Sequence, residues 1–272
     1  MNRHPIIFLF AILFAYVDAL GAGMSKPERT QAQLIGPVKQ VKIEFAKVRN
    51  INGKWVPELP RIPWIETTYA KNGYRIEEEQ FYTEKTLDFK SVFNYDTEGN
   101  LSDGIEYDYK GGVSFKWTYA YDPVKKHIEK KQLFPDGALF SKTTYLYDDL
   151  GNLIEEKRYL QQTKNRFRWH YLYDNEGRKT EEAYYLMRSG NRNEKMKSLL
   201  NFKAVFAYDN EGNLITETKY NASGMVSSKR HFEYKYDHLG NWVTQTALES
   251  IADDAKPEPT EITYRTIHYY PQ

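Results

Sequence analysis

The residues best suited to bind a ligand lie in and around one break in an otherwise regular sequence pattern, between Tyr185 and Phe202. This segment is locally basic, whereas the whole chain of 272 residues has a net charge of only +1. Cations attract anions and aromatic rings offer flat contact surfaces, so we expect an acidic glycan or an acidic protein surface as the ligand. A tolerated surface insertion without any role is the alternative. The candidate ligand-binding residues are Trp169, Tyr184, Tyr185, Arg188, Arg192, Lys195 and Lys197.

The sequence lacks the motifs and residue spacings that are typical of catalytic and metal-binding sites. The chain has no cysteine, no Gly-x-Ser-x-Gly, no His-Glu-x-x-His and no glycine-rich phosphate loop. The histidines lack ligand spacing, and the carboxylates are spread too evenly to single out a glycosidase pair. We therefore expect a protein that is not an enzyme, with no catalytic residue, no metal and no cofactor. The nearly balanced charge also argues against a nucleic-acid partner.

A repeat sets the frame in which these residues lie. Its units begin at a tyrosine, and the first four spacings are all 26 residues. One later unit carries the insertion described above, and the frame survives on both sides of it. A fixed period of this length indicates one supersecondary unit copied along the chain. The seven repeat tyrosines are Tyr69, Tyr95, Tyr121, Tyr147, Tyr173, Tyr208 and Tyr236.

Five of the seven units read Tyr-Asp-x-x-Gly, which is a turn signal. The aspartate caps backbone amides two residues on, and the glycine accepts a left-handed conformation that would strain other residues. We predict positive φ angles at Gly151 and Gly212. The turns after Tyr69 and Tyr121 lack one of the two residues and should be less well defined.

Each turn should join two antiparallel strands. Aromatic residues alternate before the tyrosine, as in Phe167, Trp169 and Tyr171, and a large apolar residue recurs 12 places after it. The sequence predicts an all-β fold, an antiparallel meander of about 14 strands from seven repeats of about 26 residues, forming a twisted or coiled open sheet. Helix should be scarce.

Charged residues alternate with the aromatic ones on the other face of these strands. Glutamate and aspartate recur on the outgoing strands, so cross-strand ion pairs on a solvated face are the simplest interpretation. A charged track for a polyanionic sugar chain is the alternative. The basic residues, five places before the last six repeat tyrosines, are Lys90, Lys116, Lys142, Arg168, Lys203 and His231.

The N-terminus has the composition of a signal peptide. A charged start precedes an apolar run from Ile6 to Val17, which is roughly 12 residues against the ~20 that span a bilayer. Small residues follow, so we assign residues 1–22 to the signal peptide, with an uncleaved anchor as the alternative. Residues 23–65 should form an N-terminal segment, loose to about Gln33, with an edge strand beginning at Val41, an Asn52-Gly53 turn and a proline-rich extended connection. Residues 66–272 should form the repeat domain.

The motif Tyr-Asp-x-x-Gly-Asn-Leu, at Tyr147–Leu153 and Tyr208–Leu214, resembles the YD repeat of Rhs-type and teneurin-like proteins. The resemblance covers roughly residues 69–270. It implies a secreted or surface-exposed sheet of successive hairpins, associated with carbohydrate binding or, in large members, with enclosing a toxin domain. Seven units are few for enclosing a cargo, so we do not expect that role here.

Two functional hypotheses remain open. The first is a secreted or surface-exposed, non-enzymatic binding or structural module for a glycan or an envelope protein, located in the periplasm, on the cell surface or outside the cell. It expects no membrane insertion of the mature chain. The alternative is an outer-membrane β-barrel, which requires an apolar band facing lipid, whereas charged residues such as Glu155 and Lys157 interrupt the strands.

Overall fold

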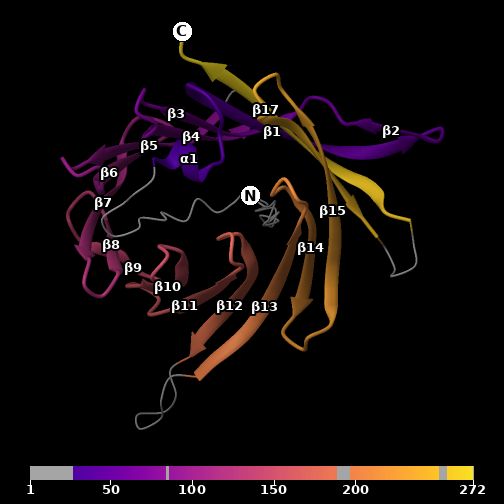
Figure 1. The fold of residues 1–272 in the computed structure, drawn as a ribbon. Helices are drawn as coiled ribbons and strands as arrows, with labels where there is room; N and C mark the ends of the chain where they lie inside the picture. Colours follow the sequence, from indigo (N-terminus) through magenta and orange to yellow (C-terminus); the bar gives the residue numbers. More distant parts are fainter. Residues whose placement is uncertain (1–26, 84–85, 189–196, 251–255, 272) are drawn as a thin grey trace, which may run out of the picture.

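The computed structural model describes residues 27–83, 86–188, 197–250 and 256–271, and these residues form a ring of antiparallel strands (Figure 1). One short helix, α1, precedes the strands at Glu28–Gln31. The strands of the N-terminal half are β1 (Val38–Ile51), β2 (Lys54–Pro57), β3 (Ile62–Tyr69), β4 (Arg75–Thr83), β5 (Thr86–Tyr95), β6 (Leu101–Asp108), β7 (Val113–Asp122), β8 (His127–Leu133) and β9 (Leu139–Tyr147). They continue as β10 (Leu153–Leu160), β11 (Arg166–Tyr173), β12 (Lys179–Arg188), β13 (Lys197–Tyr208), β14 (Leu214–Asn221), β15 (Val226–Tyr236), β16 (Trp242–Glu249) and β17 (Glu258–Tyr269).

The ring closes because β1 pairs on one side with β3 and on the other with β17. Val41 lies opposite Thr67 of β3 and opposite Ile267 of β17, so the first and last strands share one continuous hydrogen-bonded sheet. The result is a closed antiparallel barrel of 16 strands. The short strand β2 extends the end of β1 outside this ring through the Asn52-Gly53 turn.

This closure corrects two expectations. The prediction of an open sheet of about 14 strands is wrong, because the alternating pattern of β1 allows it to join both ends of the meander. The expectation that the mature chain does not insert into a membrane is also corrected. It rested on charged residues such as Glu155 and Lys157 in the strands, whereas a closed barrel satisfies its backbone internally and is an architecture that can span a bilayer. The barrel therefore agrees better with the outer-membrane alternative than with an open binding module.

The turns that follow the repeat tyrosines, called here the tyrosine turns, have the predicted geometry. Gly151 and Gly212 have φ angles of +83° and +86°. In the first of these turns the carboxylate of Asp148 accepts hydrogen bonds from the amides of Leu150 and Asn152, at 2.9 and 2.8 Å. The turn after Tyr121 differs, as expected, because Lys126 takes the positive φ and the register shift that accompanies the other tyrosine turns is missing there. The turn after Tyr69 was also expected to be less well defined, but it is regular, with a φ of +93° at Gly73.

The strands have distinct inward and outward faces. The inward face carries the buried aromatic rows, including Trp117, Tyr145 and Tyr171, together with buried charges such as Glu156 and Glu217. Helix α1 lies inside the ring (Figure 1), and Leu34 after it packs against Val41, Ile65 and Tyr69 of the inward face. The alternating residues, among them the predicted basic row, consequently face outward.

The outward charges form the predicted cross-strand pairs. Lys90 contacts Glu77 at 2.6 Å, and Lys203 contacts Glu181 at 3.1 Å. Arg168 contacts Glu155 at 2.6 Å in the same way. The charged rows therefore neutralise each other in part along the outside of the barrel.

Two N-terminal details differ from the predictions. The chain was expected to be loose to about Gln33, yet residues 27–33 are ordered, because Glu28 is buried and accepts a hydrogen bond from the Arg75 amide at 3.2 Å. Pro63 was assigned to a connection, yet it lies in β3 opposite Glu44, where a register shift accommodates it. In the part of the chain that the structure describes, no helix is long and apolar enough to cross a membrane.

Candidate binding site

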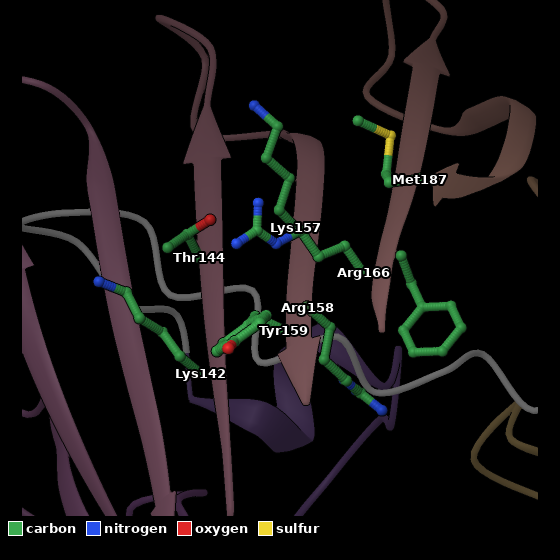
Figure 2. A pocket seen from close by; sticks show the side chains of 8 residues that line it. Lys142, Thr144, Lys157, Arg158, Tyr159, Arg166 and Met187 are labelled. Carbon is green, nitrogen blue, oxygen red and sulfur yellow. The ribbon is translucent and has the colours of Figure 1, made fainter. Parts of the chain in front are cut away.

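A cavity of about 280 Å³ opens on the outward face where β9 to β12 lie side by side. Figure 2 shows its lining side chains gathered over neighbouring strands. Register explains the gathering, since Tyr159 pairs with Lys142 on one side and with Arg166 on the other, and Arg166 pairs with Met187. The lining consists of Lys142, Thr144, Lys157, Arg158, Tyr159, Arg166, Phe167 and Met187. Two of these residues, Arg158 and Phe167, occupy inward-facing register positions, where they contact Glu156 and Trp169.

Cations surround the tyrosine ring at the centre of this cavity. The guanidinium of Arg166 lies 4.9 Å from the centroid of the Tyr159 ring, and the Lys164 ammonium lies 5.9 Å from it. Lys157 contacts Glu155 at 2.5 Å, and Lys142 pairs with Glu129. No carboxylate belongs to the lining, so its charge is positive while the Tyr159 ring and the aliphatic stems supply apolar wall.

The cavity lies at the end of the barrel away from the tyrosine turns. Strand β10 ends at Leu160, whose amide donates to the carbonyl of Asn165 at 2.9 Å and closes a short turn. Lys164 has a φ of +58° in that turn, which brings its side chain near Tyr159. The position 12 places after the repeat tyrosine carries an aromatic ring near the rim in five of the seven repeats, whereas Leu133 and Leu248 occupy it in the other two.

The structure separates the residues that the sequence proposed as a ligand site. Trp169 and Tyr184 face inward and their ring centroids lie 4.8 Å apart. Tyr185 faces outward beside Arg168, 5.8 Å from its guanidinium carbon. The backbones of Arg188 and Lys197 pair across β12 and β13, whereas Arg192 and Lys195 lie outside the described residues. The ligand assignment of these seven residues stays a prediction.

The sequence pattern did not predict most of this cavity, because its lining residues come from several repeats. Lys142 and Tyr159 belonged to rows that the sequence displays, but their adjacency follows only from the pairing of β9 with β10. Arg166 and Met187 occupy positions without a repeated residue type. The register of neighbouring hairpins was the signal that could have found them.

A second, wider cavity of about 710 Å³ lies at the tyrosine-turn end, between residues 30–35 and the turn at Asp209. Several of its lining side chains already contact one another. The Asn213 amide donates to Asp209 at 2.9 Å, and the Arg265 guanidinium stacks 3.4 Å from the Trp242 ring centroid. We therefore take the outward cavity at Tyr159 as the better candidate. In the described residues, no group of three or more His, Asp or Glu side chains could hold a metal ion.

Comparisons with known proteins give fold-level likeness only. No protein-family model matches the chain, and no curated protein matches it significantly. A porin-like protein from Bacteroides vulgatus aligns with a TM-score of 0.43 and 13% identity, covering 86% of this chain and 99% of that protein. One from Bacteroides uniformis aligns with a TM-score of 0.35 and 10% identity over 86% and 99%.

The Tc holotoxin pore of Photorhabdus luminescens is a further structural neighbour. Its TM-score is 0.33 at 13% identity, over 76% of this chain but 13% of that chain. Likenesses this weak carry no argument about activity or ligands. The similarity to YD-repeat proteins accordingly rests on the sequence motif, and the function rests on the geometry described above.

Proposed function

We propose that this protein is an outer-membrane-type β-barrel of the cell envelope, exported by its N-terminal segment. The observation that carries the proposal is the pairing of β1 with β17, which removes both free edges of the sheet. A membrane protein cannot leave strand edges unpaired in lipid, and a closed barrel is the solution available to strands.

Residues on the outward face near the two rims of the barrel also support a membrane location. A row of aromatic residues, including Tyr107, Tyr159 and Tyr220, lies near one rim, next to the basic row. Aromatic rings and long cationic side chains are the residues that favour the boundary between lipid and water. Towards the other rim, Leu146 and Leu172 present apolar side chains with exposed fractions of 36% and 46%.

Ion pairs occupy the outward face between these two rims. A surface fully embedded in lipid would leave pairs such as Lys203 with Glu181 without water, which is costly. How deeply the barrel inserts into the bilayer therefore decides whether these charged rows are compatible with a membrane-spanning protein. An experiment must distinguish a barrel that spans the bilayer from one attached to its surface.

Fractionation of cells that express the full chain supplies this test. We expect the protein in the outer-membrane fraction, resistant to high salt and alkaline carbonate, and released by detergent. Complete release by salt or carbonate without detergent would overturn the spanning barrel. Protease treatment of intact cells, with digestion confined to turns at one end, provides an independent check of orientation.

The proposal includes no catalysis. The sequence has no Gly-x-Ser-x-Gly and no His-Glu-x-x-His motif, and the cavity at Tyr159 presents cations and an aromatic ring without an acid–base pair inside it. A relation to YD-repeat proteins is part of the proposal on the strength of the seven-unit motif. Binding of an acidic glycan stays a prediction from the basic segment between Tyr185 and Phe202.

A further inference from the structure

The outward cavity at Tyr159 combines two properties that an ordinary ion-paired surface lacks. Its neighbourhood holds an excess of positive charge, and it has an apolar wall with a measurable volume. We propose that this cavity binds the anionic phosphate headgroup of a membrane amphiphile. This inference rests on the proposed envelope location of the barrel, because the cavity faces outward near a rim.

The charge excess follows from shared carboxylates. Glu129 contacts both Lys131 and Lys142, and Glu155 contacts both Lys157 and Arg168. Two carboxylates thus serve four cations, and the guanidinium of Arg166 lies beside the Tyr159 ring. A phosphate group carries the charge and the several acceptor oxygens that such a cluster attracts.

The apolar wall distinguishes an amphiphile from a free anion. Met187 and the Tyr159 ring line the cavity together with the stems of Lys142 and Lys157. A headgroup at the ammonium groups would place the first part of an acyl chain against these surfaces. Lysine and arginine near a rim also keep their charged ends at the level of the lipid headgroups.

The other repeats supply a matched control. Lys203 occupies the same position in its repeat as Lys142, and each is paired with a carboxylate, Glu181 and Glu129 respectively. Lys203 does not line the cavity. Lys142→Gln and Lys203→Gln thus remove the same charge and the same kind of ion pair, with only the first removal inside the cavity.

The experiment titrates the purified full-length barrel, in a non-ionic detergent, with dihexanoyl phosphatidate by calorimetry. Inorganic phosphate and dihexanoyl phosphatidylcholine are titrated in parallel at the same detergent concentration. We expect phosphatidate to bind most tightly, with affinity about tenfold lower in Lys142→Gln and in Arg166→Gln and unchanged in Lys203→Gln. Circular dichroism confirms that each variant is folded.

Several outcomes would overturn the inference. Equal binding of inorganic phosphate and phosphatidate would identify a free-anion site, and equal binding of phosphatidylcholine would identify an apolar groove. Equal losses in Lys142→Gln and Lys203→Gln would show general surface attraction. The titration uses a soluble amphiphile, so it measures binding at the cavity whether or not the barrel spans a membrane. A failure of the spanning-barrel proposal can therefore be distinguished from a failure of this site.

Discussion

At the scale of single residues, the repeat tyrosine does more than mark a turn. The hydroxyl of Tyr121 donates to the carbonyl of Leu101 at 2.7 Å, and that of Tyr208 donates to Lys179 at 2.7 Å. Each bond joins one repeat to the outgoing strand of the repeat before it. Tyrosine rather than phenylalanine recurs at this position because its hydroxyl satisfies a backbone group on the inward face.

Gly151 offers a test of the turn geometry. A Cβ there would meet nothing within 4 Å, so substitution adds backbone strain without crowding. We expect Gly151→Ala to lower the free energy of unfolding by about 1 kcal/mol, since alanine disfavours a φ of +83°. Gly151→Asn is the matched control, because asparagine tolerates this conformation. Urea denaturation measures both, and equal losses would contradict the conformational explanation.

The turn carboxylates predict a dependence of stability on pH. The backbone amide of Asn100 donates to Asp96 at 2.8 Å and lowers the pKa of that carboxyl. A lowered pKa in the folded state contributes stability above the unfolded pKa of about 3.9, and this contribution is lost as pH falls through the folded pKa. We expect Asp96→Asn to be less stable than the unmodified protein at pH 7, with the difference shrinking in acid. Denaturation at both pH values measures it, and a constant difference would exclude the linkage.

At the scale of elements, residues 27–37 form hydrogen bonds on both sides of the region where the barrel closes. At one end Glu28 accepts from the Arg75 amide and contacts the Tyr95 hydroxyl at 2.7 Å. At the other end the Ile35 amide donates to Asn241 at 2.7 Å. The segment therefore connects β4 and β5 with the turn between β15 and β16, across the strands that form the seam.

Removal of the Glu28 carboxylate tests this connection. Glu28→Ala takes away the acceptor of a buried amide, so we expect a loss of about 1 to 3 kcal/mol in unfolding free energy. Tyr95→Phe removes the hydroxyl, which lies 2.7 Å from both Glu28 and the Arg75 carbonyl, but keeps the Glu28 acceptor of the Arg75 amide and should cost less. Chemical denaturation of both variants gives the comparison. A Glu28→Ala variant as stable as the unmodified protein would show that the segment only rests on the barrel.

At the scale of the whole molecule, closure predicts a specific covalent link. Lys42 of β1 lies opposite Thr266 of β17 on the outward face, and the sequence contains no cysteine to compete. Opposed residues in antiparallel strands are within disulfide range. We expect Lys42→Cys with Thr266→Cys to form an intramolecular disulfide on mild oxidation, seen as faster migration on a non-reducing gel. Lys42→Cys with Lys203→Cys is the control and should remain reduced. No disulfide in the first pair would contradict the closed ring.

The sequence by itself determined the local structure. The Asp and Gly of each tyrosine turn, the alternation of aromatic and charged residues, and the pairing of Lys90 with Glu77 depend on neighbours within one hairpin or the next, so the pattern contains them. The scarcity of helix follows from the same alternation. These features need no knowledge of how distant repeats meet.

Only the tertiary structure decided closure and the site at Tyr159. An open and a closed sheet have the same alternation, and the choice depends on whether β1 pairs with β17 at the far end of the chain. The cavity needs the register of four strands to bring Lys142, Tyr159 and Arg166 into one row. Long-range pairing and register are set by the twist summed around the whole sheet, which no single repeat of the sequence specifies.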